Sequence, residues 1–147
     1  MSNDVTFESL NLHPLILRAI EEAGYTNATP IQAQAIPVVM DGHDLMASAQ
    51  TGTGKTAAFG LPIINNLDLN KSVVQALIIA PTRELCMQIT NDLMKYSSHT
   101  RGVKIVAVYG GASITGQMKD IKNGANIVVA TPGRLIDLIK RKAVNLM

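Results

Sequence analysis

The chain has 147 residues, about the length of one domain and enough to bury a hydrophobic core. Hydrophobic residues make up 47% of the sequence, which excludes a disordered chain. The formal net charge is only +2 and the 13 Lys and Arg residues form no long run, so charge alone does not argue for nucleic-acid binding.

Cysteine content and hydropathy exclude two further classes of protein. The single cysteine, Cys86, excludes an intramolecular disulfide and a multi-cysteine zinc site. Because it lies at the start of a predicted helix, we interpret it as a small buried residue rather than a nucleophile. No signal peptide opens the sequence, and no apolar run approaches the length of a membrane span. We therefore expect a soluble, cytoplasmic protein.

The first forty residues predict a loose start followed by two helices. Residues 1–10 are mostly polar and, apart from Phe7, are expected to be loose. Apolar residues recur at helical spacing through residues 12–23, and Gly24 ends that helix. Thr29-Pro30 has the form of a helix cap followed by proline at the first helical position. The second helix should kink at Pro37.

An eight-residue stretch at residues 49–56, Ala-Gln-Thr-Gly-Thr-Gly-Lys-Thr, lies between an apolar run at residues 44–48 and a predicted helix. Its glycines let the backbone fold tightly around an anion, and the helix N-terminus adds further N–H groups. Lys55 can reach the outer phosphates of a nucleotide, and the Thr56 hydroxyl can hold Mg²⁺. This pattern is that of a phosphate-binding P-loop, with Ala49 where the strict form has glycine.

The P-loop predicts a nucleotide-binding site. An ordinary glycine-rich turn before a helix is the alternative, but Gly-Lys-Thr at this spacing between a strand and a helix is rarely accidental. The site would consist of Ala49, Thr51, Gly52, Thr53, Gly54, Lys55 and Thr56.

Three further pairs of strand and helix follow the P-loop helix, which should end near Leu67. Nearly continuous runs of Val, Ile and Ala that alternate with helices are typical of a parallel sheet with helices on both faces. We therefore predict an α/β fold in which residues 75–80 form a buried strand. The expected strands are residues 75–80, 103–108 and 126–130, and the expected helices are residues 81–97, 115–122 and 131–141.

The segments that directly follow the strands contain the residues suited to ligand binding. In a right-handed parallel sheet such segments all emerge at the carboxyl edge, where ligands bind. Glycines, small polar residues and arginines suit contact with phosphate groups. Taken singly, each segment could be an ordinary helix cap or a solvated arginine, but their occurrence after consecutive strands favours a shared ligand-binding edge. The segments are the P-loop, residues 81–85, residues 110–111 and residues 131–134.

This ordered set resembles the first RecA-like domain of a DEAD-box ATP-dependent RNA helicase, from about Phe7 to the C-terminus. The P-loop resembles the family's A-x-T-G-x-G-K-T, which accounts for Ala49. Residues 24–32 resemble its Q motif, with Ala28 where the family usually has proline and Phe7 at the upstream aromatic position. The resemblance implies a RecA-like P-loop fold truncated before the DEAD strand, so that residues 1–147 form the N-terminal part of the first helicase domain. The motifs that resemble the family's RNA-backbone motifs are residues 81–85, 110–111 and 131–134.

The resemblance also implies roles for single residues, with ATP and Mg²⁺ as cofactors. Gln32 should read the adenine edge, because a carboxamide offers both a donor and an acceptor. Phe7 and Tyr25 would pack near the base, and Thr29 would belong to the same site. Lys55 and Thr56 would be the catalytic residues, with Thr56 also at the metal. The implied RNA-binding residues are Pro81, Thr82, Arg83, Gly110, Gly111, Thr131, Pro132, Gly133 and Arg134.

No Asp-Glu-x-Asp and no Ser-Ala-Thr occurs in the 147 residues, although both are motifs of the family's first domain. The sequence therefore lacks the carboxylates that, in the family, hold Mg²⁺ and orient the attacking water. It also lacks the second RecA-like domain with its arginine fingers. We expect a fragment that binds ATP and RNA without hydrolysing ATP. In the proteins it resembles, the strands of these motifs separate residues 44–48 from residues 75–80, so we also expect unpaired sheet edges here. The 147 residues would then be marginally stable, or their sheet would be completed by swapping or by a further segment.

Two other classes of protein stay open. One is a natural short module that binds nucleotide or RNA without turnover. The other is an unrelated P-loop kinase or GTPase, although a GTPase should carry an Asn-Lys-x-Asp base reader and the sequence has none.

Overall fold

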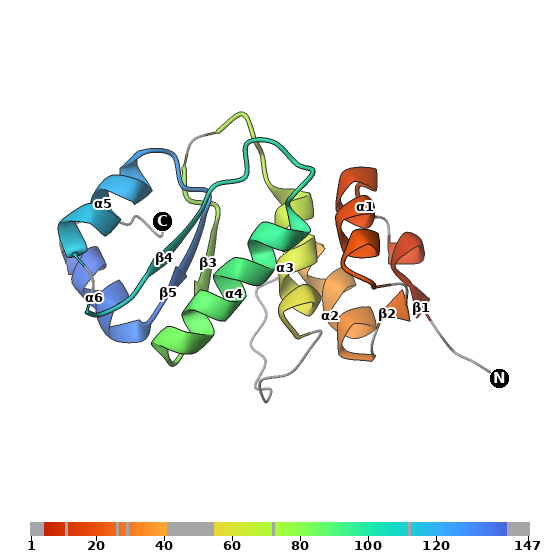
Figure 1. Cartoon of the computed structure of the whole chain (residues 1–147), viewed down its shortest axis with the longest axis horizontal. Helices are drawn as coiled ribbons and strands as arrows, with labels where there is room; N and C mark the ends of the chain where they lie inside the picture. Colours follow the sequence, from red (N-terminus) through yellow and green to blue (C-terminus); the bar gives the residue numbers. More distant parts are fainter. Residues whose placement is uncertain are drawn as a thin grey trace. The chain divides into compact units, whose positions relative to one another are not determined.

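The computed structural model describes residues 5–10, 12–25, 27–28, 30–40, 55–71, 73–111 and 113–140 (Figure 1). The strand predicted at residues 44–48 and the first six residues of the P-loop, 49–54, lie outside these described residues. The expected loss of strand pairing there therefore stays a prediction. The chain divides into two compact units, which are described separately. The first is Met1–Asn66 with Asp92–Arg101, and the second is Leu67–Asn91 with Gly102–Met147.

The first unit begins with a small antiparallel ladder rather than the loose segment expected from its polar composition. Strand β1 (Val5–Thr6) pairs with β2 (Asn27–Ala28), and a 3-10 helix, η1 (Phe7–Leu10), follows β1. Phe7 is 2% exposed. The expectation of a loose segment was wrong for the residues around Phe7, because the ladder and the buried ring of Phe7 anchor them. The partners of both lie about twenty positions further along the chain.

Three helices make up most of the first unit, and their bounds follow the predicted ones. Helix α1 (Pro14–Glu22) buries Ile16, Ala19 and Ile20 along one face, and Gly24 follows it with a φ of +90°. That left-handed conformation favours glycine, as expected at a helix end. Helix α2 (Pro30–Met40) begins at proline and continues through Pro37.

Helix α3 (Lys55–Asn66) joins α1 and α2 through its last two residues. The Asn65 side-chain oxygen Oδ1 accepts a hydrogen bond of 2.7 Å from the His13 backbone N–H, just before α1. The Asn66 side-chain amide donates to the Met40 carbonyl at 3.0 Å and to the Val39 carbonyl at 3.4 Å. These side chains satisfy backbone groups at helix ends, which have no partner within their own helices.

The second unit is a parallel sheet with helices on both faces, as predicted. Its strands are β3 (Ala76–Ile79), β4 (Ile105–Val108) and β5 (Ile127–Ala130), in the order β3-β5-β4. Helices α5 (Ile114–Lys122) and α6 (Pro132–Lys140) lie on one face (Figure 1). The first part of α4 (Arg83–Tyr96) lies on the other face, where the Cys86 thiol donates a hydrogen bond to the Val129 carbonyl at 3.2 Å.

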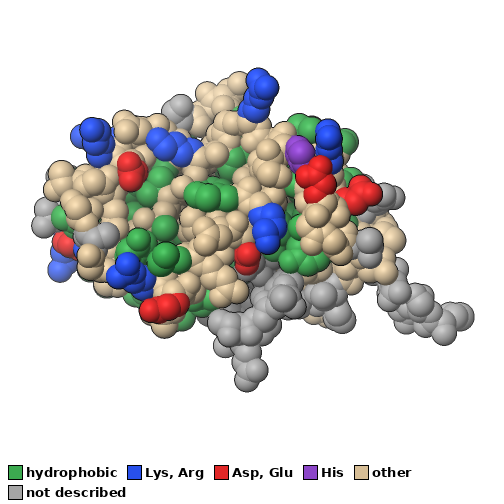
Figure 2. Space-filling view, viewed as in Figure 1, with side chains coloured by type: hydrophobic (Ala, Val, Ile, Leu, Met, Phe, Trp, Pro, Cys, Tyr) green, Lys and Arg blue, Asp and Glu red, His purple; other side chains and the backbone are tan. Residues whose placement is uncertain are grey.

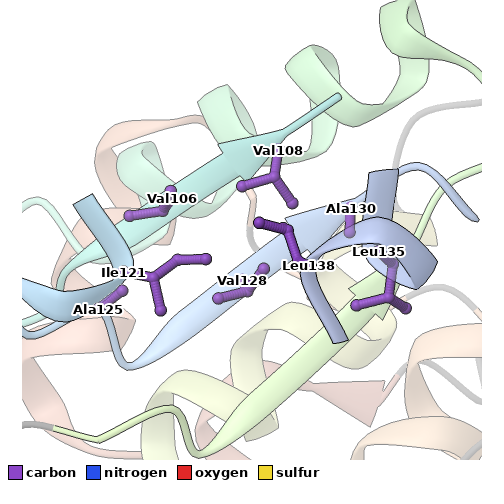
Figure 3. Close-up of a cluster of buried hydrophobic side chains, with 8 residues drawn as sticks. All are labelled: Val106, Val108, Ile121, Ala125, Val128, Ala130, Leu135 and Leu138. Carbon is purple, nitrogen blue, oxygen red and sulfur yellow. The ribbon is translucent and has the colours of Figure 1, made fainter. Parts of the chain in front are cut away.

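Alternate residues of β4 and β5 point toward α5 and α6 and form the core of this unit (Figure 3). Because successive side chains of a strand point to opposite faces, the other residues of β5 face α4. Every residue of β5 is buried. The α5–α6 side of the core consists of Val106, Val108, Ile121, Ala125, Val128, Ala130, Leu135 and Leu138.

Strand β3 is not the buried strand that its apolar sequence predicted. Its first three residues are half-buried, and Ile79 is 57% exposed. Among the described strands β3 and β4 each pair only with β5, but the buried cluster beside α5 and α6 takes its strand residues from β4 and β5. From β3, only the partly buried Leu77 packs against it. Sequence shows that a segment is apolar, but neighbouring strands decide how much of it is covered.

None of the described helices combines the length and the apolar character that a membrane span requires.

Candidate functional site

Three of the four segments predicted to form a ligand-binding edge follow strands of the second unit whose last residues are in register. Ile79 and Val108, the last residues of β3 and β4, both pair in parallel register with Ala130 at the end of β5. The backbone N–H of Thr131 donates to the Val108 carbonyl at 3.0 Å, which ties the third segment to the end of β4. Residues 81–85, 110–111 and 131–134 therefore share one edge.

The segment after β3 combines a helix cap with an exposed arginine. The hydroxyl oxygen of Thr82 accepts a hydrogen bond from the Leu85 backbone N–H at 3.2 Å, which caps the N-terminus of α4. The Arg83 guanidinium lies over the ring of Tyr109, with Cζ 4.8 Å from the ring centroid. Pro81, Thr82 and Arg83 are all exposed, so this segment presents a cation and small polar groups at the rim of the sheet.

The segment after β4 contains the one glycine of this edge whose backbone has a positive φ. Gly111 has a φ of +91°, a conformation that side chains with a Cβ rarely adopt. A Cβ at this position would also lie 3.6 Å from Nη1 of Arg83. Gly110 and Gly111 are exposed, so the backbone here is open to a ligand beside the arginine.

The segment after β5 places Arg134 in the first turn of α6, which begins at Pro132. Nη1 of Arg134 donates a hydrogen bond of 3.0 Å to the side-chain oxygen of Gln117, on α5. The Gln117 side-chain amide in turn donates to the Tyr109 carbonyl at 3.2 Å. Thr131 and Arg134 are partly exposed, and Pro132 and Gly133 are exposed.

Tyr109 and Gln117 are the residues of this edge that the sequence interpretation missed. Tyr109 directly follows β4 and precedes the glycine pair, a position that could have drawn attention to it. Gln117 is 7% exposed and shares the inner face of α5 with Ile121. A polar residue on the apolar face of a predicted helix needs a buried hydrogen-bond partner, and this could have marked Gln117 in the sequence.

The predicted adenine-site residues lie in the first unit, where two of them come together. The rings of Phe7 and Tyr25 have centroids 6.3 Å apart, and Tyr25 also contacts the ring of Tyr96 at 6.2 Å. Burial and a hydrogen bond with Tyr25 raise the pKa of Tyr96 far above its ordinary value. Aromatic packing of this kind is what the two residues would do as ordinary core residues.

Phe7 and Tyr25 also line an open pocket of about 270 Å³, and Gln32 is not among its lining residues. Gln32 lies on α2 with 1% of its surface exposed. The remaining lining residues are Thr6, Leu17, Ile20, Glu21 and Asn27.

Lys55 and Thr56 form the first turn of α3, as the P-loop pattern predicts. Ala49, Thr51, Gly52, Thr53 and Gly54 lie outside the described residues, as does Thr29. Within the described part of the chain, no group of three or more His, Cys, Asp or Glu side chains could hold a metal ion.

Cys86 is confirmed as a buried residue of the sheet–helix interface. It is fully buried, and burial raises the pKa of its thiol above the ordinary value. A thiol with a raised pKa is a poor nucleophile near neutral pH, which agrees with a packing role.

The sequence model of the DEAD/DEAH box helicase family matches residues 29–147. The chain belongs to this family. The DEAD-box ATP-dependent RNA helicase CshA of Streptococcus pneumoniae is 53% identical over 140 residues, which cover 95% of this chain and 26% of that protein. The DEAD-box ATP-dependent RNA helicase RhpA of Helicobacter pylori is 50% identical, over 95% of this chain and 28% of that protein.

A solved structure of a DEAD box protein has a similar fold. The crystal structure of a DEAD box protein from the hyperthermophile Methanococcus jannaschii has a TM-score of 0.87 and 39% identity, covering 96% of this chain and 38% of that one. The predicted α/β architecture is thus confirmed as the RecA-like fold of DEAD-box proteins. The chain spans about a quarter of the length of the helicases CshA and RhpA.

Proposed function

We propose that the chain is the ATP- and RNA-binding portion of an ATP-dependent DEAD-box RNA helicase that remodels or unwinds RNA. The family membership and the names of its relatives support this proposal. The observation that carries it is the shared carboxyl edge of β3, β5 and β4, at which Arg83, Gly111 and Arg134 come from three separate segments.

This edge suits an RNA backbone better than the bases. Two guanidinium groups and the exposed glycine backbone offer N–H donors, and phosphate and sugar oxygens are acceptors. Contacts of this kind hold a strand without reading its sequence. On the face drawn in Figure 2, the Lys and Arg side chains of the described residues are scattered among acidic and uncharged ones. Together with the net charge of only +2, this suggests that affinity should come from the arginines of the edge rather than from a broad basic surface.

For the nucleotide, the donor set fits ATP and Mg²⁺ in its chemistry. Lys55 supplies a cation and Thr56 a hydroxyl at the N-terminus of α3, where helix N–H groups favour phosphate. The carboxamide of Gln32, on α2, has the donor and the acceptor that an adenine edge calls for. Bound Mg²⁺ would neutralise charge on the phosphate oxygens. The role of these residues is to bind and orient the nucleotide.

The RNA-binding edge is tested by titrating labelled oligouridine with the 147-residue chain at several NaCl concentrations. We expect weak binding that falls steeply with salt, because a second RecA-like domain would supply the other half of the RNA-binding groove. Arg134→Ala should weaken binding equally for different RNA sequences and reduce the slope of log K against log salt by about 1.

Arg101→Ala is the matched control, since Arg101 is an exposed arginine in the turn after α4, outside the three segments. It removes the same charge and should leave affinity close to the parent value. A strong preference for one RNA sequence, or an equal effect of the two substitutions, would contradict the proposed interface.

A further inference from the structure

The two arginines of the proposed RNA-binding edge are held by a pair of residues that no motif of the sequence assigns. Tyr109 lies under Arg83, and Gln117 binds both Arg134 and the carbonyl of Tyr109. We propose that Tyr109 and Gln117 are positioning residues that fix Arg83 and Arg134 in the orientation that receives the RNA backbone. This inference rests on the proposed function of the edge.

The Gln117 carboxamide is oriented by its two partners. An arginine side chain can only donate hydrogen bonds and a backbone carbonyl can only accept them. The side-chain oxygen of Gln117 must therefore face Arg134, and its NH₂ group must face the Tyr109 carbonyl, as observed at 3.0 Å and 3.2 Å. At 7% exposure, Gln117 has little access to water that could replace either contact.

Tyr109 connects the two halves of this arrangement. Its ring supports the Arg83 guanidinium at 4.8 Å, a cation–π contact that leaves N–H donors at the guanidinium edge. Its carbonyl is the acceptor for Gln117, which holds Arg134. The segments after β3, β4 and β5 are therefore linked through Tyr109, which directly follows the outer strand β4.

Fixing these side chains in advance should strengthen RNA binding. Arginine side chains have many rotamers, and ordering one on binding lowers affinity by about twofold to tenfold. A side chain that is already held in the free protein avoids most of this loss. Removing the support should therefore cost affinity only while the arginine it supports is present, and this distinguishes positioning from a general structural role.

The first experiment is a double-mutant cycle of Gln117→Met and Arg134→Ala, read by anisotropy of labelled oligouridine at low salt. Methionine keeps the length and volume of glutamine but makes neither hydrogen bond. We expect Gln117→Met to reduce affinity by about threefold to tenfold in the parent. In the Arg134→Ala background the same substitution should have little further effect. Gln88→Met, at an exposed glutamine of α4, is the matched control and should bind like the parent.

The second experiment uses Tyr109 and keeps the inference testable if Gln117→Met does not fold, which a thermal melt will show. Tyr109→Phe retains the ring and the backbone carbonyl, so its affinity should stay near the parent value. Tyr109→Leu removes the ring and should weaken binding, but only when Arg83 is present. If Tyr109→Phe keeps the parent affinity and Tyr109→Leu has no effect in the Arg83→Ala background, the ring of Tyr109 is what supports Arg83.

The outcomes separate this inference from the proposed function. If Arg134→Ala and Arg83→Ala leave RNA affinity unchanged, the RNA-binding edge itself is wrong. If they weaken binding but the Gln117 and Tyr109 substitutions do not, or do so equally with and without their arginines, the edge stands and the positioning role is refuted.

Discussion

At the scale of single residues, Lys55 offers the sharpest test of nucleotide binding. It lies in the first turn of α3, and it is the only long cationic side chain in the eight-residue P-loop. Charge-assisted contacts to phosphate are worth about 1.5–3 kcal/mol, so Lys55→Ala should lower ATP affinity by about tenfold to a hundredfold. Isothermal titration calorimetry measures this directly.

Lys119→Ala is the control for this substitution, because Lys119 is an exposed lysine of α5 outside every predicted site. It should bind ATP as the parent does. Equal affinity of the parent and Lys55→Ala would show that the P-loop pattern does not hold a nucleotide in this chain.

At the scale of elements, Gly60 lets α3 approach the last part of α4 closely. A Cβ at Gly60 would lie 2.6 Å from Cδ2 of Leu93, and Leu93 is fully buried, so it cannot simply move aside. Overpacking costs about 1–3 kcal/mol, whereas alanine gains at most about 1 kcal/mol over glycine in helix propensity. We expect Gly60→Ala to lower the free energy of unfolding in a denaturant titration.

Gly116 provides a matched comparison within α5. The nearest atom to a Cβ there would be the Ser113 hydroxyl at 3.8 Å, an ordinary contact. Gly116→Ala should be neutral or slightly stabilising through helix propensity. If both substitutions had the same effect, the close approach at Gly60 would not matter for stability.

A hydrogen-bonded contact between Glu22 of α1 and His99, in the turn after α4, should make stability depend on pH. Nε2 of His99 lies 2.7 Å from Oε2 of Glu22, and this hydrogen bond holds the pKa of the Glu22 carboxyl below its ordinary value. A carboxyl whose pKa is lowered by folding stabilises the protein above its unfolded pKa. That contribution is lost as the pH falls through the lowered pKa.

The matching experiment compares the melting temperatures of the parent and Glu22→Gln at several pH values. We expect a small difference near neutral pH that shrinks in acid, because Glu22 is exposed and solvent screens the pair. A difference that grew as the pH fell through the carboxyl range would contradict this assignment.

At the scale of the whole molecule, we predict that the 147 residues by themselves bind ATP without RNA-stimulated hydrolysis. The sequence contains no Asp-Glu-x-Asp, so the carboxylates that hold Mg²⁺ and orient the attacking water in the family have no counterpart in it. A phosphate-release assay with purified chain and RNA measures turnover. Release above background that disappears in Lys55→Ala would show that these residues suffice for the chemistry.

The sequence alone predicted helices α1 to α6, strands β3, β4 and β5, and the motifs that follow these strands. Helix bounds near Gly24, Pro30 and Lys55 were predicted from caps, proline and glycine, because these signals act within one or two turns of the chain. The alternation of apolar strands with helices indicated a parallel sheet, and the order of motifs pointed to the helicase family, which the family match confirmed. The roles of single site residues stay predictions.

Only the tertiary structure decided which residues meet. The strand order β3-β5-β4 leaves β3 half-exposed, and β1 with Phe7 is ordered by residues far along the chain. Tyr109 and Gln117 became visible as the link between two arginines only once three strand ends were adjacent. The reason is physical: local spacing sets how a segment folds, but burial and hydrogen-bond partners depend on segments distant in sequence that the completed sheet brings together.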